Sequence, residues 1–152
     1  MKRGAILNKD LSEVLASMGH GDWLIVCDAG FPIPEGVRRV DLAIKADLPD
    51  LETVLSLIAD GFIAEKVYFA EELAEFNGPL HAKIRQIFSG TELSTLPHEK
   101  ILSEAAKQAK AIVRTGAFDP WGNVILQSGV DLPNWFNKPG VVVPDYYKDK
   151  LS

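Results

Sequence analysis

Only one of the 152 residues is a cysteine, Cys27. A lone cysteine excludes a disulfide within the chain, which favours a reducing compartment, so we expect a cytoplasmic protein. No apolar run approaches the roughly 20 residues of a membrane span, and the apolar segment at residues 4–7 is too short for a signal peptide.

Basic residues number 16 against 21 acidic ones, for a net charge of −5, and they form no basic patch. We therefore expect neither nucleic acid nor membrane as a partner.

Motifs for metals and nucleotides are also missing. Neither His-x-x-x-His nor Cys-x-x-Cys spacing occurs, and no glycine-rich loop has dinucleotide or P-loop spacing. A metal site built from His20, Asp28 and His98, as in a metal-dependent hydrolase, remains a distant alternative. Cys27 as a nucleophile is weaker still, because a cysteine in an apolar run is usually an inert small hydrophobe. We expect no metal and no cofactor.

Apolar strands and amphipathic helices alternate along the chain. Trp23–Cys27 is an uninterrupted apolar run, typical of a strand buried on both faces. Further strands are predicted at residues 39–44, 65–70, 91–96, 111–113 and 123–126. Helices are predicted after Asn8, from Pro49, after Gly78, and from Pro97 to about residue 107. The pattern predicts a single three-layer α/β/α domain with a mixed, largely parallel sheet.

The last 22 residues differ from the rest. Residues 131–152 hold three prolines and four aromatic residues, too many aromatics for a free tail. We expect a domain at residues 1–130 and an extension at 131–152 that packs on the domain or on a neighbouring subunit.

Two side chains flank the first strand within eight positions of each other, His20 before it and Asp28 after it. Histidine is the side chain whose unperturbed pKa lies nearest neutrality, and ligands of α/β proteins bind at the carboxyl ends of strands. This pairing suits chemistry on a small polar molecule such as a sugar. The alternative is structural: a histidine favoured at a helix end and an aspartate capping a loop.

A second polar loop precedes the last strand and contains Trp121, Gly122 and Asn123. An indole can stack on the apolar face of a sugar, and an amide both donates to and accepts from hydroxyls. The alternative is a turn with one buried aromatic. His98 begins a helix, where a histidine alone is more often structural, and His81 is expected to be a surface or packing residue.

Taken together, segments in order from Lys2 to Val130 resemble the D-ribose pyranase and L-fucose mutarotase family. The resemblance is carried by KRG at 2–4, LN at 7–8, MGHGD at 18–22, CDAGFPIP at 27–34, RVDLA at 39–43, AEE at 70–72, HE at 98–99, IVRTG at 112–116, PWGNVIL at 120–126 and GV at 129–130. The DAGFPIP string at 28–34 is similar to the ribose branch, since the fucose branch usually has histidine in place of Gly30. The chain departs from the family at Trp121, usually tyrosine, and at Leu102, commonly lysine in the ribose branch.

The resemblance implies a cofactor-free isomerase that interconverts pyranose and furanose forms, and anomers, of D-ribose or a similar monosaccharide. It implies His20 as the general acid/base. The sugar-binding residues that it implies are Asp28, His98, Trp121, Gly122 and Asn123. Members of the family assemble as homo-oligomers, typically decamers of two stacked pentamers, with sites where subunits meet. The alternatives are a mutarotase for another sugar such as L-fucose, or a non-catalytic monosaccharide-binding protein associated with sugar transport.

Overall fold

The structure is a computed structural model and describes residues 1–151. Six strands form one sheet in the order β2-β5-β1-β6-β3-β4. Their bounds are β1 Trp23–Cys27, β2 Arg38–Asp41, β3 Ala64–Ala70, β4 Glu92–Leu96, β5 Ala111–Arg114 and β6 Val124–Ser128. β1, β2 and β5 are mutually parallel, as are β3 and β4, whereas β6 runs antiparallel to both β1 and β3. The predicted mixed, largely parallel sheet is confirmed.

This topology gives the sheet two distinct ends. At the carboxyl end of the sheet, β1 to β5 finish and β6 begins. At the amino end of the sheet, β1 to β5 begin and β6 finishes. Because β6 is antiparallel, the loop before it meets the loops that follow the other strands. Residues far apart in the sequence are therefore brought together at each end.

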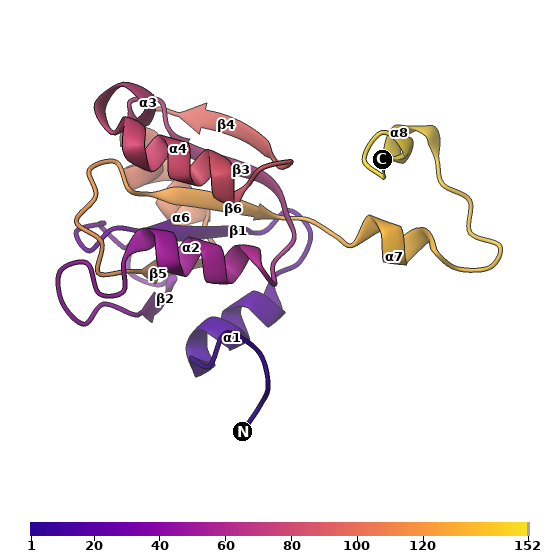
Figure 1. Cartoon of the computed structure of the whole chain (residues 1–152), viewed down its shortest axis with the longest axis horizontal. Coiled ribbons are helices and arrows are strands. Elements are labelled where there is room, and N and C mark those ends of the chain that lie inside the picture. Colours follow the sequence, from indigo (N-terminus) through magenta and orange to yellow (C-terminus); the bar gives the residue numbers. More distant parts are fainter. Residues whose placement is uncertain (152) are drawn as a thin grey trace.

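Helices cover both faces of the sheet (Figure 1). Their bounds are α1 Lys9–Ser17, α2 Leu51–Ala59, α3 Leu73–Phe76, α4 Gly78–Ile87, α5 His98–Lys100, the π-helical turn η1 Ile101–Ala105, α6 Ala106–Gln108, α7 Leu132–Phe136 and α8 Asp145–Lys148. α2 and α4 lie side by side on one face, with α6 behind the sheet on the other, as the three-layer prediction requires. Within residues 1–151, no helix combines the length and apolarity needed to span a membrane.

Local sequence signals explain the first helices. The Asn8 side chain accepts a hydrogen bond from the Leu11 amide at 2.9 Å, and Asp50 accepts one from the Thr53 amide at 2.8 Å. Both are N-caps that satisfy amides without helical partners. The strand predicted at 39–44 ends at Asp41 instead, because the chain turns back there and the Ile44 amide bonds to the Leu48 carbonyl at 2.9 Å. The short helix α3 was not predicted.

Strand β1 runs through the centre of the core. Leu24 to Cys27 are fully buried, as expected for a strand covered on both faces. Burial raises the pKa of the Cys27 thiol strongly, so it remains protonated at neutral pH and is a poor nucleophile. The cysteine-nucleophile alternative is thereby disfavoured.

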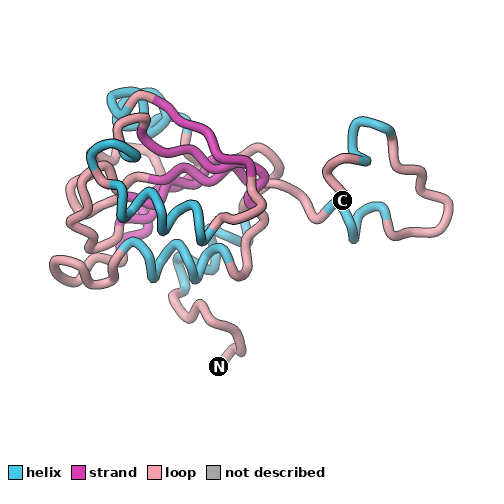
Figure 2. Tube along the Cα trace, turned by 45° about the horizontal axis from the view of Figure 1, so that its top comes forward, coloured by secondary structure: helices cyan, strands magenta, loops and turns pink. Residues whose placement is uncertain are grey.

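The C-terminal extension leaves β6 at the amino end of the sheet and projects from the domain (Figures 1 and 2). Its residue Leu132 is buried, and its aromatic rings pack on one another, with Tyr147 between Phe136 and Tyr146 at centroid distances of 5.5 and 4.8 Å. Much of its apolar surface remains exposed in the single chain. The residue at position 152, the last of the predicted extension, lies outside the described residues.

Candidate functional site

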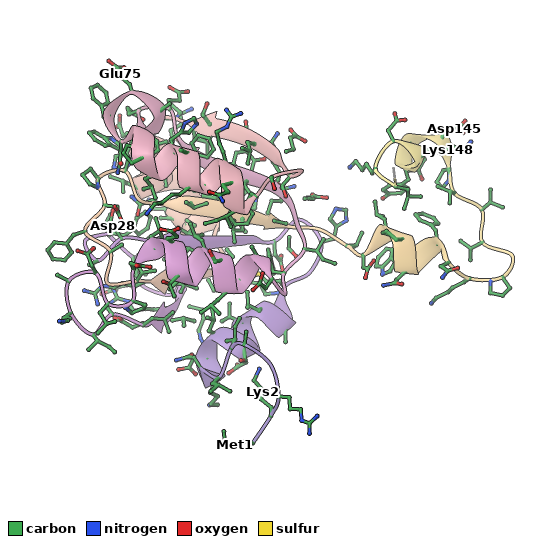
Figure 3. The ribbon with its side chains drawn as sticks, viewed as in Figure 1. Met1, Lys2, Asp28, Glu75, Asp145 and Lys148 are labelled. Atoms are coloured by element: carbon green, nitrogen blue, oxygen red, sulfur yellow. The ribbon has the colours of Figure 1, made fainter. Side chains whose placement is uncertain are left out.

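Asp28 and Asn123 meet at the carboxyl end of the sheet. Asp28 follows β1 directly, and Asn123 precedes β6, so the antiparallel pairing of these strands places them side by side. The Asp28 amide donates to the Asn123 Oδ1 at 3.1 Å. Asp28 Oδ1 accepts from the Gly30 amide at 2.8 Å, the Asx-turn geometry that is the structural alternative. Figure 3 shows Asp28 at the side of the domain away from the C-terminal extension.

The loop before β6 is held in a tight turn. Trp121 has a φ of 57°, and the buried Gly122 leaves no room for a side chain, because a Cβ there would lie 2.8 Å from the Asp119 carbonyl oxygen. The Trp121 ring stacks on Phe76 at 5.1 Å and 26°. The Asn77 side chain donates to the carbonyl of Pro120 at 3.0 Å. The loop is thus tied to α3 and α4.

His98 lies at the same end of the sheet, at the start of α5 and next to the outermost strand, β4. It follows β4, and its backbone amide donates to the carboxylate of Glu72 at 3.2 Å. Its Nδ1 atom is buried and has no hydrogen-bond partner among the described residues. A buried nitrogen without a hydrogen-bond partner lowers the stability of the fold.

Three aspartates, Asp47, Asp50 and Asp119, line one cavity at this end of the sheet. Burial raises the pKa of Asp119, and the nearby carboxylates of Asp47 and Asp50 raise it further while Lys83 lowers it. These four side chains line an open cavity of about 320 Å³. The described residues contain no cluster of three or more His, Cys, Asp or Glu side chains arranged to hold a metal ion.

His20 lies at the amino end of the sheet, opposite the other predicted residues. It precedes β1, and the next residue, Gly21, donates its amide to the carbonyl of Ser128 at the end of β6 at 2.8 Å. Within one chain, the structure therefore brings together Asp28, Trp121, Gly122 and Asn123, with His98 at the same end, but not His20. A metal site made of His20, Asp28 and His98 from one chain is excluded by this separation.

The turn that carries His20 is fixed by Asp22. Its carboxylate accepts from the Gly19 amide at 2.8 Å and from the Lys110 ammonium at 2.7 Å. The hydrogen bonds from Lys110 and from the Gly19 amide hold the pKa of Asp22 below its ordinary value. Gly21 has a φ of 84°, a conformation that favours glycine. The imidazole is thereby displayed at the surface.

A cavity of about 560 Å³ lies beside His20. One side is formed by the starts of β3 and β4, including Glu65 and Glu92, and the other by Tyr147 and Lys150 of the extension. His20 Nε2 lies 2.9 Å from Glu65 Oε2. Sequence reasoning missed Glu65, because a single acidic residue at the start of a predicted strand has no motif that pairs it with a residue 45 positions away.

The family profile covers the domain, and two relatives also match the extension. The sequence profile of the RbsD / FucU transport protein family matches residues 1–131. D-ribose pyranase 2 of Rubrobacter xylanophilus is 63% identical over 152 residues, which are 100% of this chain and 99% of that one. D-ribose pyranase 1 of Streptomyces griseus is 52% identical over 99% of this chain and 100% of its own. The structure of Bacillus subtilis RbsD complexed with D-ribose superposes with a TM-score of 0.81 at 39% identity, covering 86% of this chain and 98% of that one.

Proposed function

Because this chain belongs to the RbsD / FucU transport protein family, we propose that it interconverts the pyranose and furanose forms, and the anomers, of D-ribose without a cofactor. The observation that carries the proposal is the 63% identity to a D-ribose pyranase over essentially the full length of both chains. The D-ribose in the complex of the Bacillus subtilis relative supports the choice of sugar. The alternatives from the sequence, another sugar or binding without catalysis, become outcomes of the test below.

We assign the proton transfers to His20. Ring opening removes the proton of the anomeric hydroxyl and breaks the bond between the anomeric carbon and the ring oxygen. The electron pair goes to the ring oxygen, which takes up a proton, and the open-chain aldehyde forms. A different hydroxyl then attacks the aldehyde carbon and closes the furanose ring; this hydroxyl gives up its proton, and the aldehyde oxygen takes one up. An imidazole can act in both transfers near neutral pH, a contribution of roughly 10²–10⁴-fold when it is well placed.

We assign sugar binding to the carboxyl end of the sheet. Asp28 accepts hydrogen bonds from hydroxyls, and the amide of Asn123 offers both a donor and an acceptor. His98 supplies a further ring nitrogen, and Trp121 supplies an aromatic face for the sugar. Gly122 permits the close backbone turn that fixes the conformation of the loop. Holding the ring against the proton carrier in this way converts a chance encounter into an intramolecular step.

We propose that each complete site is shared between two subunits. His20 and the sugar-binding residues lie at opposite ends of one sheet, so a site that contains both needs the amino end of one copy against the carboxyl end of the next. Such head-to-tail contacts close into rings when the rotation permits. This agrees with the expected decamer of two stacked pentamers. The unmet His98 Nδ1 and the exposed apolar side chains Ile44, Leu48, Phe76 and Phe118 support a covered carboxyl end.

The extension belongs to the same assembly in this proposal. It leaves the amino end of the sheet, where the next subunit would sit, and carries exposed Trp135, Val142 and Tyr146. We propose that residues 131–152 pack on that neighbouring subunit. The free, buried thiol of Cys27 fits action in the cytoplasm, a reducing compartment.

Magnetisation-exchange NMR on D-ribose at equilibrium tests the function. We expect the wild-type protein to accelerate pyranose–furanose exchange and His20→Ala to abolish the acceleration without loss of fold. Acceleration that survives in His20→Ala would remove His20 from the mechanism. Binding of ribose without acceleration would favour the binding protein, and acceleration with L-fucose but not ribose would favour another mutarotase.

A further inference from the structure

We propose that Glu65 is a positioning residue for His20: it fixes the orientation and the proton arrangement of the imidazole. The inference rests on the proposed function of His20 and concerns a residue outside the expected site. The two side chains come from different elements, His20 from the turn before β1 and Glu65 from the start of β3. Their contact at 2.9 Å joins Nε2 to Oε2. The imidazole is 47% exposed and the carboxylate 27%, so the pair lies at the wall of the cavity.

The carboxylate of Glu65 is also held by a second hydrogen bond, on the side away from His20. Its second oxygen, Oε1, accepts from the side-chain amide nitrogen of Gln127 at 2.6 Å. Gln127 belongs to β6, which pairs with β3 in this region. A carboxylate held through both oxygens is confined to one rotamer, and it presents a fixed acceptor to His20. Without the bond from Gln127, the glutamate side chain would sample several rotamers, because its conformational entropy favours them.

The direction of each hydrogen bond follows from the groups behind Gln127. The indole nitrogen of Trp23 can only donate, and it lies 3.3 Å from Gln127 Oε1. The Tyr68 hydroxyl donates to the same oxygen at 3.0 Å. The oxygen of the Gln127 amide therefore faces Trp23 and Tyr68, and its nitrogen must face Glu65. In this network of hydrogen bonds, each donor therefore faces an acceptor.

The consequence for His20 is a defined tautomer. An ionised carboxylate accepts only, so the Nε2 atom that contacts Glu65 must carry a hydrogen. In the neutral ring, Nδ1 is then the nitrogen with a free lone pair, the one able to take a proton from a sugar hydroxyl. This is the arrangement in which a carboxylate orients a histidine in other acid–base sites. Glu65 acts through His20 and need not touch the sugar.

Glu65→Gln tests the role, with Glu92→Gln as the matched control. Both variants remove one carboxylate from the wall of the same cavity, but Glu92 pairs with Lys66 at 2.7 Å rather than with His20. We expect Glu65→Gln to lower kcat for ribose exchange about 10- to 100-fold, less than the loss of the whole acid–base contribution, with KM nearly unchanged. We expect Glu92→Gln to keep the wild-type kcat.

Nitrogen-15 NMR of the imidazoles gives a readout that does not depend on activity. We expect neutral His20 in the wild-type protein to carry its hydrogen on Nε2, with the signal assigned by its absence in His20→Ala. In Glu65→Gln, the new amide oxygen must still accept from Gln127, so its nitrogen faces His20. An amide nitrogen only donates, so we expect the hydrogen of neutral His20 to move from Nε2 to Nδ1. This measurement on the wild type remains decisive even if Glu65→Gln folds poorly.

The outcomes separate the two proposals. A wild-type protein that does not accelerate ribose exchange would overturn the proposed function, whatever the tautomer. A wild-type kcat in Glu65→Gln, an equal loss in Glu92→Gln, or a His20 hydrogen on Nδ1 in the wild type would overturn the positioning role and leave the proposed function standing.

Discussion

His20 and Asp28 stand at opposite ends of strand β1, although only eight positions separate them in the sequence. The five residues of this strand span about 16 Å at roughly 3.3 Å per residue. Hydrogen bonds to one sugar require distances near 3 Å. The two residues of one chain therefore cannot act on the same sugar, whereas those of two chains can.

Mixing two inactive variants tests this directly. We expect His20→Ala and Asp28→Asn each to lose ribose exchange when assembled alone. Hybrid assemblies, made by dissociating both proteins and reassembling them together, should regain about a quarter of the wild-type rate if head-to-tail neighbours mix at random. Only sites that combine His20 from one variant with Asp28 from the other are intact. The NMR exchange measurement with ribose reports the recovery.

Three further samples serve as controls for the mixing experiment. Each variant taken alone through dissociation and reassembly should stay inactive, and wild-type protein treated in the same way should recover its full rate. Hybrid assemblies without any recovered exchange would contradict a site shared between subunits, provided that mass measurement shows both variants in one assembly.

Much of the fold follows from local sequence signals. The caps at Asn8 and Asp50 and the apolar run of β1 are properties of a few adjacent residues, and the sequence is sufficient to locate them. The end of β2 at Asp41 is different. It depends on a turn that closes through the carbonyl of Leu48, and strand propensity alone extends the strand too far.

The site is less accessible from sequence than the fold. The meeting of Asp28 with Asn123 depends on β6 pairing antiparallel with β1, which no local pattern encodes. Glu65 becomes visible only when β3 and the turn before β1 are placed in space. Asp28 lies at the carboxyl end of β1. His20 lies at the other end of the same strand, so residues that are close in the sequence on either side of a strand are far apart in space.

Gly122 offers a test of the loop geometry. An added Cβ would lie 2.8 Å from the Asp119 carbonyl oxygen and 3.0 Å from the Asp119 Cβ. We expect Gly122→Ala to lower the free energy of unfolding by about 1–3 kcal/mol, the usual cost of overpacking, and to raise the KM for ribose. Thermal unfolding should show a lower Tm, by about 2–4 °C for each kcal/mol.

Gly78→Ala is the matched control for this loop, because nothing lies within 4 Å of a Cβ built at Gly78. We expect its Tm and KM to equal those of the wild type. If Gly122→Ala were as stable and as active as Gly78→Ala, the close turn would have no role in stability or in sugar binding.

Asp22 makes the free energy of unfolding depend on pH, because it holds the turn that carries His20 through its charge. The folded protein holds the pKa of Asp22 below its ordinary value of 3.8, so the folded state binds this proton less tightly than the unfolded state. The resulting stabilisation is present above the ordinary pKa and is lost as the pH falls through the lowered one. Because both partners are partly exposed, at 34% and 42%, we expect it to stay below about 1 kcal/mol.

Thermal unfolding of wild type and Asp22→Asn across acid pH checks this expectation. The wild type should have the higher Tm at pH 7, and the two Tm values should converge as the pH drops well below 3.8. Lys110→Met should reproduce the pattern, since it removes the hydrogen-bond donor that lowers the pKa of Asp22 most. A gap in Tm that stays constant down to acid pH would show that Asp22 acts through shape and not through charge.

Deleting residues 133–152 tests the role of the extension. The deletion keeps the buried Leu132 and removes Trp135, Val142 and Tyr146, which are 59%, 83% and 74% exposed in the single chain. Burying a large apolar side chain contributes roughly 1.5–3 kcal/mol, and 1.4 kcal/mol is tenfold in affinity. We therefore expect the assembly to dissociate at concentrations at least about tenfold higher than the wild type does. Sedimentation velocity across a dilution series measures this.

A point variant of the extension provides the comparison. Lys148→Ala removes a solvent-exposed pair with Asp145 and leaves the apolar side chains in place, so its assembly should match the wild type. Because the proposed shared site needs a neighbouring subunit, we also expect the deleted protein to lose ribose exchange on dilution, in step with dissociation. Unchanged assembly and unchanged kinetics in the deleted protein would mean that the extension does not hold a neighbouring subunit.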